Sequence, residues 1–428
     1  MIITEEFKNN LNEKVYDELF SRLYCCPIDE LQVHKNRYLN LIENFEKIFG
    51  KKEEISVFSA PGRTEIGGNH TDHQHGCVLA GSVNLDIIAA VSLNGLDEIR
   101  IQSEGYPLDI INLKETVPAE SEFNTAKALI RGVYAKFKSM GYNIKGFDAY
   151  TTSNVLKGSG LSSSAAFEVL IGCIMNGLFA DNQVDAVEIA RIGQFAENVY
   201  FGKPSGLMDQ MASSVGGAIA IDFQDSEKPA VKKINFDFAK SGHALCIIDS
   251  GADHSDLTYE YAAIPFDMKA VAKYFDKNYL SEVRKEDFLN NISEIRKVTG
   301  DRAVLRAFHF FKENERAKQE TQLLETAAFD EFLKIVKESG YSSYMYLQNV
   351  CPKNSSKEQA VGYTLAMCDE ILQGRGAFRV HGGGFAGTVQ AFVPLDMLED
   401  FKNKIEHTVG KNCCLTLNIR PLGGVQII

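Results

Sequence analysis

The sequence lacks any Cys-x-x-Cys spacing, although it holds nine cysteines among 428 residues. An odd number of cysteines without that spacing argues against both a disulfide framework and a zinc ribbon. No apolar run is long enough to span a bilayer. The N-terminal stretch MIITEEFKNNLNEKVYDELF has acids where a signal peptide would have a basic region and an apolar core. These absences predict a cytoplasmic protein whose cysteines are reduced.

An excess of basic side chains is also missing. The chain has 45 Lys and Arg against 57 Asp and Glu, which gives a formal net charge of −12. Nucleic acid and anionic membrane surfaces are therefore not expected as partners, because both attract basic surfaces. The length is sufficient for two domains.

Two common catalytic motifs do not occur. No Gly-Lys-Ser/Thr follows a glycine-rich loop at the spacing of a P-loop, and no G-x-S-x-G marks a hydrolase nucleophile. The chain has instead GSGLSSSAA (158–166), between a strand-like run at 146–153 and an apolar helical pattern at 165–179. Glycines allow close backbone approach, and the first-turn amides of a helix bind anions. We therefore expect a phosphate site formed by Gly158, Ser159, Gly160, Leu161, Ser162, Ser163 and Ser164. The alternative is a helix cap without a ligand.

A second stretch, APGRTEIGGNHTDHQHG (60–76), places hydrogen-bonding side chains between glycines. We expect a polar loop that satisfies several hydroxyl groups of a polyol. A metal site is an alternative, because His70, Asp72, His73 and His75 are all metal-ligand types, but their spacing fits no common zinc pattern. A solvated loop is the third possibility.

Two further stretches carry carboxylates or glycines. Glu197 lies in a helical pattern and Asp209 follows a glycine-rich turn, so together they would supply a magnesium ligand and a base. Asp209 alone would also suit a first helical turn. The stretch RVHGGGFAGT (379–388) lies between apolar strands and has no matching nucleophile elbow. Its glycines are expected to let the backbone approach another part of the protein or its ligand.

The order of the predicted elements is of the mixed α+β kind. Two helical patterns fill 4–50, and strands and helices alternate irregularly from there to 223, with one strand candidate at 77–93. A polar seam at 224–229 predicts a boundary between an N-terminal domain (1–225) and a C-terminal domain (226–428).

Taken together, four motifs in this order resemble the galacto-, homoserine, mevalonate and phosphomevalonate (GHMP) kinase superfamily, and within it the galactokinases. The galactokinase signature, roughly GRxNxIGEHxDY, then GLSSSAA, GxMDQ and GGGFGG, is matched by GRTEIGGNHTDH (62–73), GLSSSAA (160–166), GLMDQ (206–210) and GGGFAG (382–387). The resemblance spans nearly the whole chain. It implies a ribosomal-S5-like N-terminal domain and a ferredoxin-like C-terminal domain with the active site between them.

The resemblance also implies roles for individual residues. Asp209 matches the catalytic aspartate and Arg63 the arginine beside it. Ser164 and Glu197 match the magnesium side, and 158–164 match the triphosphate loop of ATP. The expected sugar contacts are Glu65, Asn69, His70, Asp72 and Tyr261. Phosphoryl transfer asks mainly for positioning and charge neutralisation, so a carboxylate and a neighbouring cation suffice. The partners implied are ATP, Mg²⁺ and a small sugar, bound by a monomer or a weak homodimer.

The sequence departs from the signature mostly on the sugar side. Asn69 stands where galactokinases have Glu, Glu65 replaces Asn, Gly67 replaces Ile and His73 replaces Tyr. The arginines that usually follow the Tyr261 position are missing. The reaction expected is phosphorylation of the anomeric hydroxyl of galactose or a close relative. Galacturonate stays an alternative substrate, because an amide at Asn69 would no longer repel a C6 carboxylate. A second alternative is that the protein is a non-catalytic sensor that binds sugar and ATP.

Overall fold

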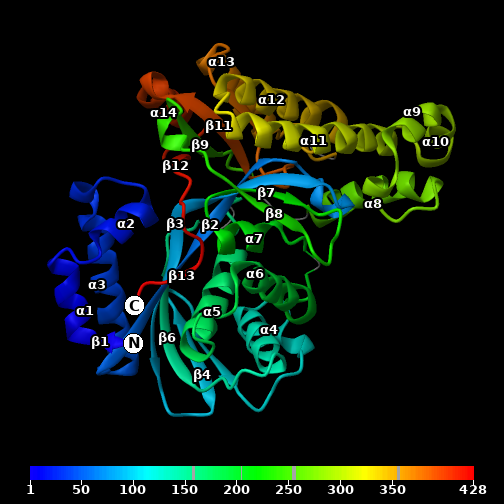
Figure 1. Ribbon diagram of the computed structural model, residues 1–428. Coiled ribbons are helices and arrows are strands. Elements are labelled where there is room, and N and C mark those ends of the chain that lie inside the picture. The colour runs from blue at the N-terminus through cyan, green and yellow to red at the C-terminus, as the bar shows by residue number, and fades with distance from the viewer. Residues whose placement is uncertain (157–159, 204, 253–256, 354–356) are drawn as a thin grey trace.

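The computed structural model describes residues 1–156, 160–203, 205–252, 257–353 and 357–428. Its larger sheet has the strand order β1-β2-β3-β6-β4-β5 (Figure 1). Strand β7 pairs with β3 and β8, and β13 pairs with β2. The bounds are β1 (Ile2–Ile3), β2 (Glu54–Gly67), β3 (Cys77–Leu93), β4 (Glu98–Ser103), β5 (Leu108–Asn112), β6 (Phe147–Ser153), β7 (Ala218–Asp222), β8 (Ala230–Ile234) and β13 (Val425–Gln426).

Helices cover both faces of this sheet (Figure 1). The strand residues Ile55, Val57 and Ile88 pack against the N-terminal helices, while Phe58 and Ala89 face the helix that follows the serine-rich loop. Alternate residues of a strand point to opposite faces, so both faces of β2 and β3 are apolar. The helices are α1 (Thr4–Asn12), α2 (Asp17–Tyr24), α3 (Gln32–Phe49), α4 (Ala126–Ser139), α5 (Ser163–Phe179), α6 (Ala186–Phe195) and α7 (Met208–Val215).

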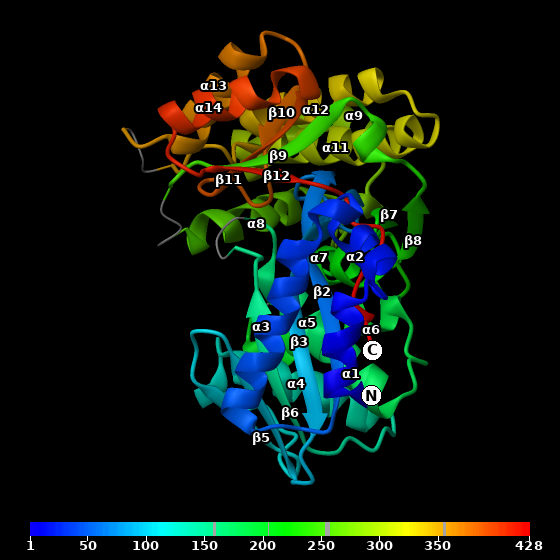
Figure 2. The ribbon, with the colours of Figure 1, turned by 90° about the vertical axis from the view of Figure 1, so that its left-hand side faces the viewer.

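A second, antiparallel sheet has the order β10-β11-β9-β12 and lies beyond one end of β2 and β3 (Figure 2). Its strands are β9 (His243–Asp249), β10 (Ala377–Val380), β11 (Thr388–Pro394) and β12 (Cys414–Leu417). Around it lie α8 (Thr258–Tyr274), α9 (Lys285–Asn290), α10 (Ile292–Thr299), α11 (Asp301–Glu325), α12 (Phe329–Ser342), α13 (Ala360–Leu372) and α14 (Leu398–Thr408). The mixed arrangement agrees with the α+β prediction.

Two local predictions were wrong. Residues 60–67 are not loop but the continuation of β2, which pairs with β3 from Ser56 to Gly67 and has register shifts at Pro61/Arg63 and Glu65/Gly67. Glycines and bulges allow a polar segment to stay in a sheet while its side chains are re-aimed. Residues 4–50 form three helices rather than two.

The boundary at 225/226 stays a prediction. Strand β8 follows it in sequence yet pairs with β7 in the larger sheet, and the last strand, β13, also returns to that sheet. All nine cysteines are free thiols. Within the described ranges no helix is both long and apolar enough to cross a membrane.

Candidate active site

Arg63 and Asp209 form a bidentate ion pair at the point where β2 meets the start of α7. Arg63 Nε lies 2.7 Å from Asp209 Oδ1, and Nη2 lies 2.7 Å from Oδ2. The parallel fork is the strongest arrangement of these two groups. Arg63 holds the pKa of the Asp209 carboxyl below its ordinary value, against the opposing effect of burial. The side chain of Asp209 keeps 31% of its surface exposed, whereas Arg63 keeps 9%, so the carboxylate is the accessible partner.

The serine-rich loop is attached to the same pair. Ser162 Oγ donates to Asp209 Oδ2 at 2.7 Å, and Arg63 Nη1 donates to the Gly160 carbonyl. Ser162 precedes α5 in the left-handed region (φ 56°) and makes no side-chain cap of that helix. The Ser162 hydroxyl therefore bonds Asp209 and does not cap α5. The backbone N–H groups in the first turn of α5 remain available to bind an anion. Gly158 and Ser159 lie outside the described residues.

Glu197 lies on a π-helical turn (Ala196–Phe201) that continues α6. It is buried, and its carboxylate accepts from Ser205 Oγ at 2.5 Å, Gln210 Nε2 at 2.8 Å and Lys203 Nζ at 3.3 Å. π-Turns inside helices occur frequently at functional sites. Ser164 is the second residue of α5. A carboxylate and a hydroxyl are oxygen donors of the kind that Mg²⁺ takes, and so both residues fit that ion.

Asn69 and Glu65 lie in a buried polar network. Asn69 Nδ2 donates to Glu65 Oε1 at 3.0 Å and to the Gly382 carbonyl at 2.7 Å. Its Oδ1 accepts from Asn349 Nδ2 at 3.0 Å and from Ser343 Oγ at 3.2 Å. Both amide hydrogens and the oxygen are therefore occupied, and Asn69 is 0% exposed. The geometry argues against the expected direct contact between Asn69 and a sugar.

Glu65 is paired with a cation from the second sheet. Arg379 Nη2 lies 2.7 Å from Glu65 Oε1, and both side chains are buried. Burial raises the pKa of Glu65, and Arg379 opposes the rise. The carboxylate of Glu313, on α11, accepts from the backbone N–H groups of Gly68 and Asn69 at 3.2 Å. The carboxylates of Glu65 and Glu313 therefore both hold the loop after β2 in place through hydrogen bonds.

The three glycines at 382–384 offer consecutive carbonyls to the sugar-side residues. Gly382 accepts from Asn69, Gly383 from His70 Nε2 at 3.0 Å, and Gly384 from the Tyr261 hydroxyl at 3.0 Å. The bond to a carbonyl requires that Nε2 of His70 carry a hydrogen, which leaves Nδ1 as an acceptor. Burial lowers the pKa of His70 to about 4, so the ring is neutral at physiological pH. The prediction that this backbone approaches another part of the protein is confirmed.

His381 connects the same segment to the serine-rich loop. Its ring nitrogens lie 3.0 Å from Thr64 Oγ1 and 3.0 Å from Thr388 Oγ1. A Cβ at Gly160 would lie 2.9 Å from His381 Nδ1, so only glycine fits there without a shift. Burial lowers the pKa of His381 well below its ordinary value. His381 is thus a neutral structural link between the two sheets.

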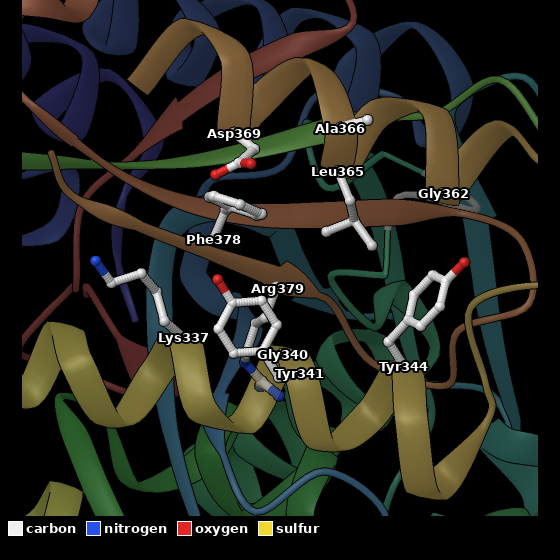
Figure 3. Close-up of a pocket in the computed structure, with 10 residues that line it drawn as sticks. All are labelled: Lys337, Gly340, Tyr341, Tyr344, Gly362, Leu365, Ala366, Asp369, Phe378 and Arg379. Carbon is white, nitrogen blue, oxygen red and sulfur yellow. The ribbon is translucent and has the colours of Figure 1, made fainter. Parts of the chain in front are cut away.

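Two cavities differ in their relation to these residues. One of about 350 Å³ is lined by Asp72, Gly206 and Leu207 together with Lys269 of α8 and residues of the loop after β7. The other, of about 340 Å³, lies between α12 and α13 and is lined mainly by apolar side chains such as Tyr341, Leu365 and Phe378 (Figure 3). The first adjoins the predicted sugar loop and the segment before Asp209. In the described part of the chain, no group of three or more His, Cys, Asp or Glu side chains forms a metal cluster, so the metal reading of 70–75 gains no support.

Sequence reasoning missed Glu313 and Asn349, and did not foresee the pairing of Arg379 with Glu65. Glu313 and Asn349 are distant in sequence from the residues they contact, for example by 244 positions between Glu313 and Asn69. No local pattern marks either one.

The fold is shared with solved kinases. The Lactococcus lactis galactokinase, solved in complex with galactose, superposes with a TM-score of 0.78 at 24% identity over 91% of this chain and 99% of that chain. A Streptococcus pneumoniae phosphomevalonate kinase, solved with phosphomevalonate and AMPPNP, gives 0.58 at 11% identity over 87% and 99%. A family model of the GHMP kinase N-terminal domain matches residues 124–217. The fold is that of a GHMP kinase.

Similar sequences identify the family within the GHMP kinases. The family model described as the galactokinase galactose-binding signature matches residues 43–93. The Clostridium tetani galactokinase is 30% identical over 380 residues, which cover 87% of this chain and 92% of that protein. The Streptomyces coelicolor galactokinase is 29% identical over 353 residues, covering 82% and 87%. The chain belongs to the galactokinase family, as its four motifs predict.

Proposed function

We propose that the protein transfers the terminal phosphoryl group of ATP to the anomeric hydroxyl of galactose, giving galactose 1-phosphate and ADP. The observation that carries the proposal is the Arg63–Asp209 pair, whose carboxylate remains accessible while both of its oxygens are oriented. Membership of the galactokinase family supports the same reaction.

In this proposal Asp209 orients the sugar hydroxyl and receives its proton. The lowered pKa keeps Asp209 ionised, which also makes it a weak base. A weak base suffices because the transition state of phosphoryl transfer is loose and catalysis depends mainly on positioning and charge neutralisation. Arg63 and Ser162 hold the carboxylate in one orientation, which reduces the entropy lost on reaching the reactive geometry.

The sugar contacts proposed are His70 and Asp72, which lie in the loop after β2, and Tyr261, which contacts the glycine segment. The neutral ring of His70 offers Nδ1 as an acceptor for a hydroxyl, and Asp72 offers a carboxylate. Glu65 and Asn69 are assigned a supporting role, because their polar atoms are already engaged by the protein.

The nucleotide site proposed comprises 158–164, where the first-turn amides of α5 would bind phosphate oxygens. Glu197 and Ser164 would hold Mg²⁺, which when bound neutralises charge on the phosphate oxygens. In this scheme the N-terminal turns of α5 and α7 orient the two substrates toward each other, with Asp209 between them. A cytoplasmic location, a monomer or weak homodimer, and a domain boundary near 225 belong to the proposal as expectations from the sequence.

A galacturonate kinase is less well supported. A C6 carboxylate would need a countercharge, and Arg379, which the fold brings to Glu65 beside Asn69, is already neutralised by Glu65. A non-catalytic sensor has no need of an oriented carboxylate with its arginine, so the intact pair favours an enzyme.

The test is a coupled assay for ADP release with galactose, N-acetylgalactosamine and galacturonate at equal concentrations. We expect the highest kcat/KM with galactose and strict dependence on Mg²⁺. Saturable galactose binding without ADP release from any of the three sugars would overturn the kinase assignment in favour of the sensor.

A further inference from the structure

A buried side-chain pair, Glu168 and Gln210, lies behind Glu197. Gln210 Nε2 is 2.8 Å from Glu197 Oε2 and 2.9 Å from Glu168 Oε2. An amide nitrogen carries two hydrogens, so one can be donated to each carboxyl group. Glu168 and Gln210 are both 0% exposed, and therefore water offers neither a substitute partner.

Two atoms of this pair identify its chemistry. Glu168 Oε1 and Gln210 Oε1 have no hydrogen-bond partner among the residues that the structure describes. An ionised Glu168 would be a second buried negative charge beside Glu197, whereas a proton on Glu168 removes that charge and turns one of its oxygens into a donor. Burial and the Glu197 carboxylate both raise the pKa of Glu168, in agreement with a neutral acid.

The pair joins α5, which follows the serine-rich loop, to α7, which carries Asp209. Glu168 follows Ser164 by one turn of α5, and Gln210 directly follows Asp209 on α7. Gly193 makes room for the pair, since a Cβ there would lie 3.1 Å from Gln210 Cγ and 3.2 Å from Glu168 Cβ. Asp209 and Gln210 point to different partners, so the first turn of α7 joins the proposed base to the proposed metal residue.

We propose that Glu168 and Gln210 are positioning residues: the carboxyl group of Glu168 fixes the amide of Gln210, and the amide fixes the carboxylate of Glu197. The inference rests on the proposed function only for the role of Glu197 in holding Mg²⁺. Residues behind a metal ligand typically change metal affinity by 10- to 100-fold when they are removed.

The experiment measures binding of Mn²⁺, as a spectroscopic substitute for Mg²⁺, to the full-length protein with ADP by electron paramagnetic resonance. Glu168→Gln keeps a neutral group of the same shape and should bind Mn²⁺ within about twofold of the unmodified protein, because an amide can pair with an amide. Glu168→Leu and Gln210→Leu should weaken binding by roughly tenfold or more. The infrared band of a protonated carboxyl group should be present in the unmodified protein and absent in Glu168→Gln.

A second pair of variants covers the case in which the leucine variants fail to fold. Gly193→Ala pushes on Glu168 and Gln210 and should weaken Mn²⁺ binding. Gly172→Ala is its matched control, because its Cβ would meet Ile189 Cγ2 at 3.0 Å in the same helix layer but away from the pair. Equal effects of the two alanine variants would reduce the pair to ordinary packing and overturn the inference.

Other outcomes separate the inference from the proposed function. If folded Glu168→Leu and Gln210→Leu bind Mn²⁺ as tightly as the unmodified protein, the positioning role is overturned. If Glu168→Gln binds Mn²⁺ weakly, the conclusion that Glu168 is protonated is overturned. Unchanged binding in Glu197→Gln removes the metal role itself and with it the inference. Whether ADP is released with galactose is decided independently by the unmodified protein.

Discussion

The side-chain amide of Asn69 donates a hydrogen bond to Glu65 Oε1 over 3.0 Å. The galactokinase signature has Asn at the position of Glu65 and Glu at the position of Asn69, so the two residue types are exchanged in this chain. The exchange puts the carboxylate next to Arg379 at 2.7 Å. It also gives the loop after β2 an amide that reaches the Gly382 carbonyl. The departures at these two positions therefore form one coupled change.

This coupling can be measured with a double-mutant cycle of the free energies of unfolding. Asn69→Glu places a second carboxylate beside Glu65 without a new cation, and Glu65→Asn leaves Arg379 without its partner. Glu65→Asn should lower the free energy of unfolding by roughly 3 kcal/mol or more, as breaking a buried pair does. Asn69→Glu should also lower it, because it buries a charge without a partner. The double exchange should cost about 1–3 kcal/mol less than the sum of the two. Urea unfolding of the four proteins measures the difference, and strict additivity would contradict the coupling.

Asp209→Asn should reduce kcat by a factor of about 10² or more while galactose binding is largely retained, because the amide keeps the shape and removes the charge and the base. The matched control is Asp185→Asn, which alters the N-cap of α6, where Asn caps as well as Asp. Steady-state kinetics and calorimetric titration with galactose give the two quantities. Wild-type turnover in Asp209→Asn would remove this residue from the mechanism.

Gly67 and Glu320 are in close contact, so we expect a change at Glu320 to compensate for a larger side chain at position 67. A Cβ at Gly67 would lie 1.6 Å from Glu320 Oε2, so the carboxyl group of Glu320 occupies the space that a side chain at position 67 would need. Gly67→Ala should destabilise the protein, and Glu320→Ala in the same chain should recover part of the loss. Gly410→Ala, where no atom lies within 4 Å, is the control. Thermal unfolding checks the order, and a double variant no more stable than Gly67→Ala would refute the pairing.

Glu320 also predicts how stability depends on pH. Burial, together with the neighbouring Glu313, raises the pKa of Glu320 well above its ordinary value. The folded state then holds a proton that the unfolded state releases, so this group lowers stability progressively as pH rises from its ordinary pKa toward the raised one. Glu320→Gln cannot ionise and should be more stable than the unmodified protein at neutral pH. Melting temperatures across this range test the sign, with the exposed Glu338→Gln as the control.

Local sequence patterns determine much of the fold. The alternation and run lengths predicted β3 at 77–93 with the bounds that the structure has, and the apolar pattern predicted α5 from 165 against an observed start at Ser163. The four motifs identified the family, because short loops that handle phosphate and hydroxyl groups need particular residues at fixed spacing.

The extension of β2 through Gly67 was not predictable in the same way. Its polar residues read as a loop in isolation, and their strand conformation depends on pairing with β3 and on two register shifts.

Only the tertiary structure decided which polar residues remain available to a ligand. Asn69 looks like a sugar contact in the linear motif, yet Asn349 and Gly382, 280 and 313 positions away, take up its hydrogen-bonding groups. Arg379 likewise becomes the partner of Glu65 across 314 positions. A sequence pattern lists the donors and acceptors, but whether a group is engaged or free depends on which distant side chains the fold buries against it.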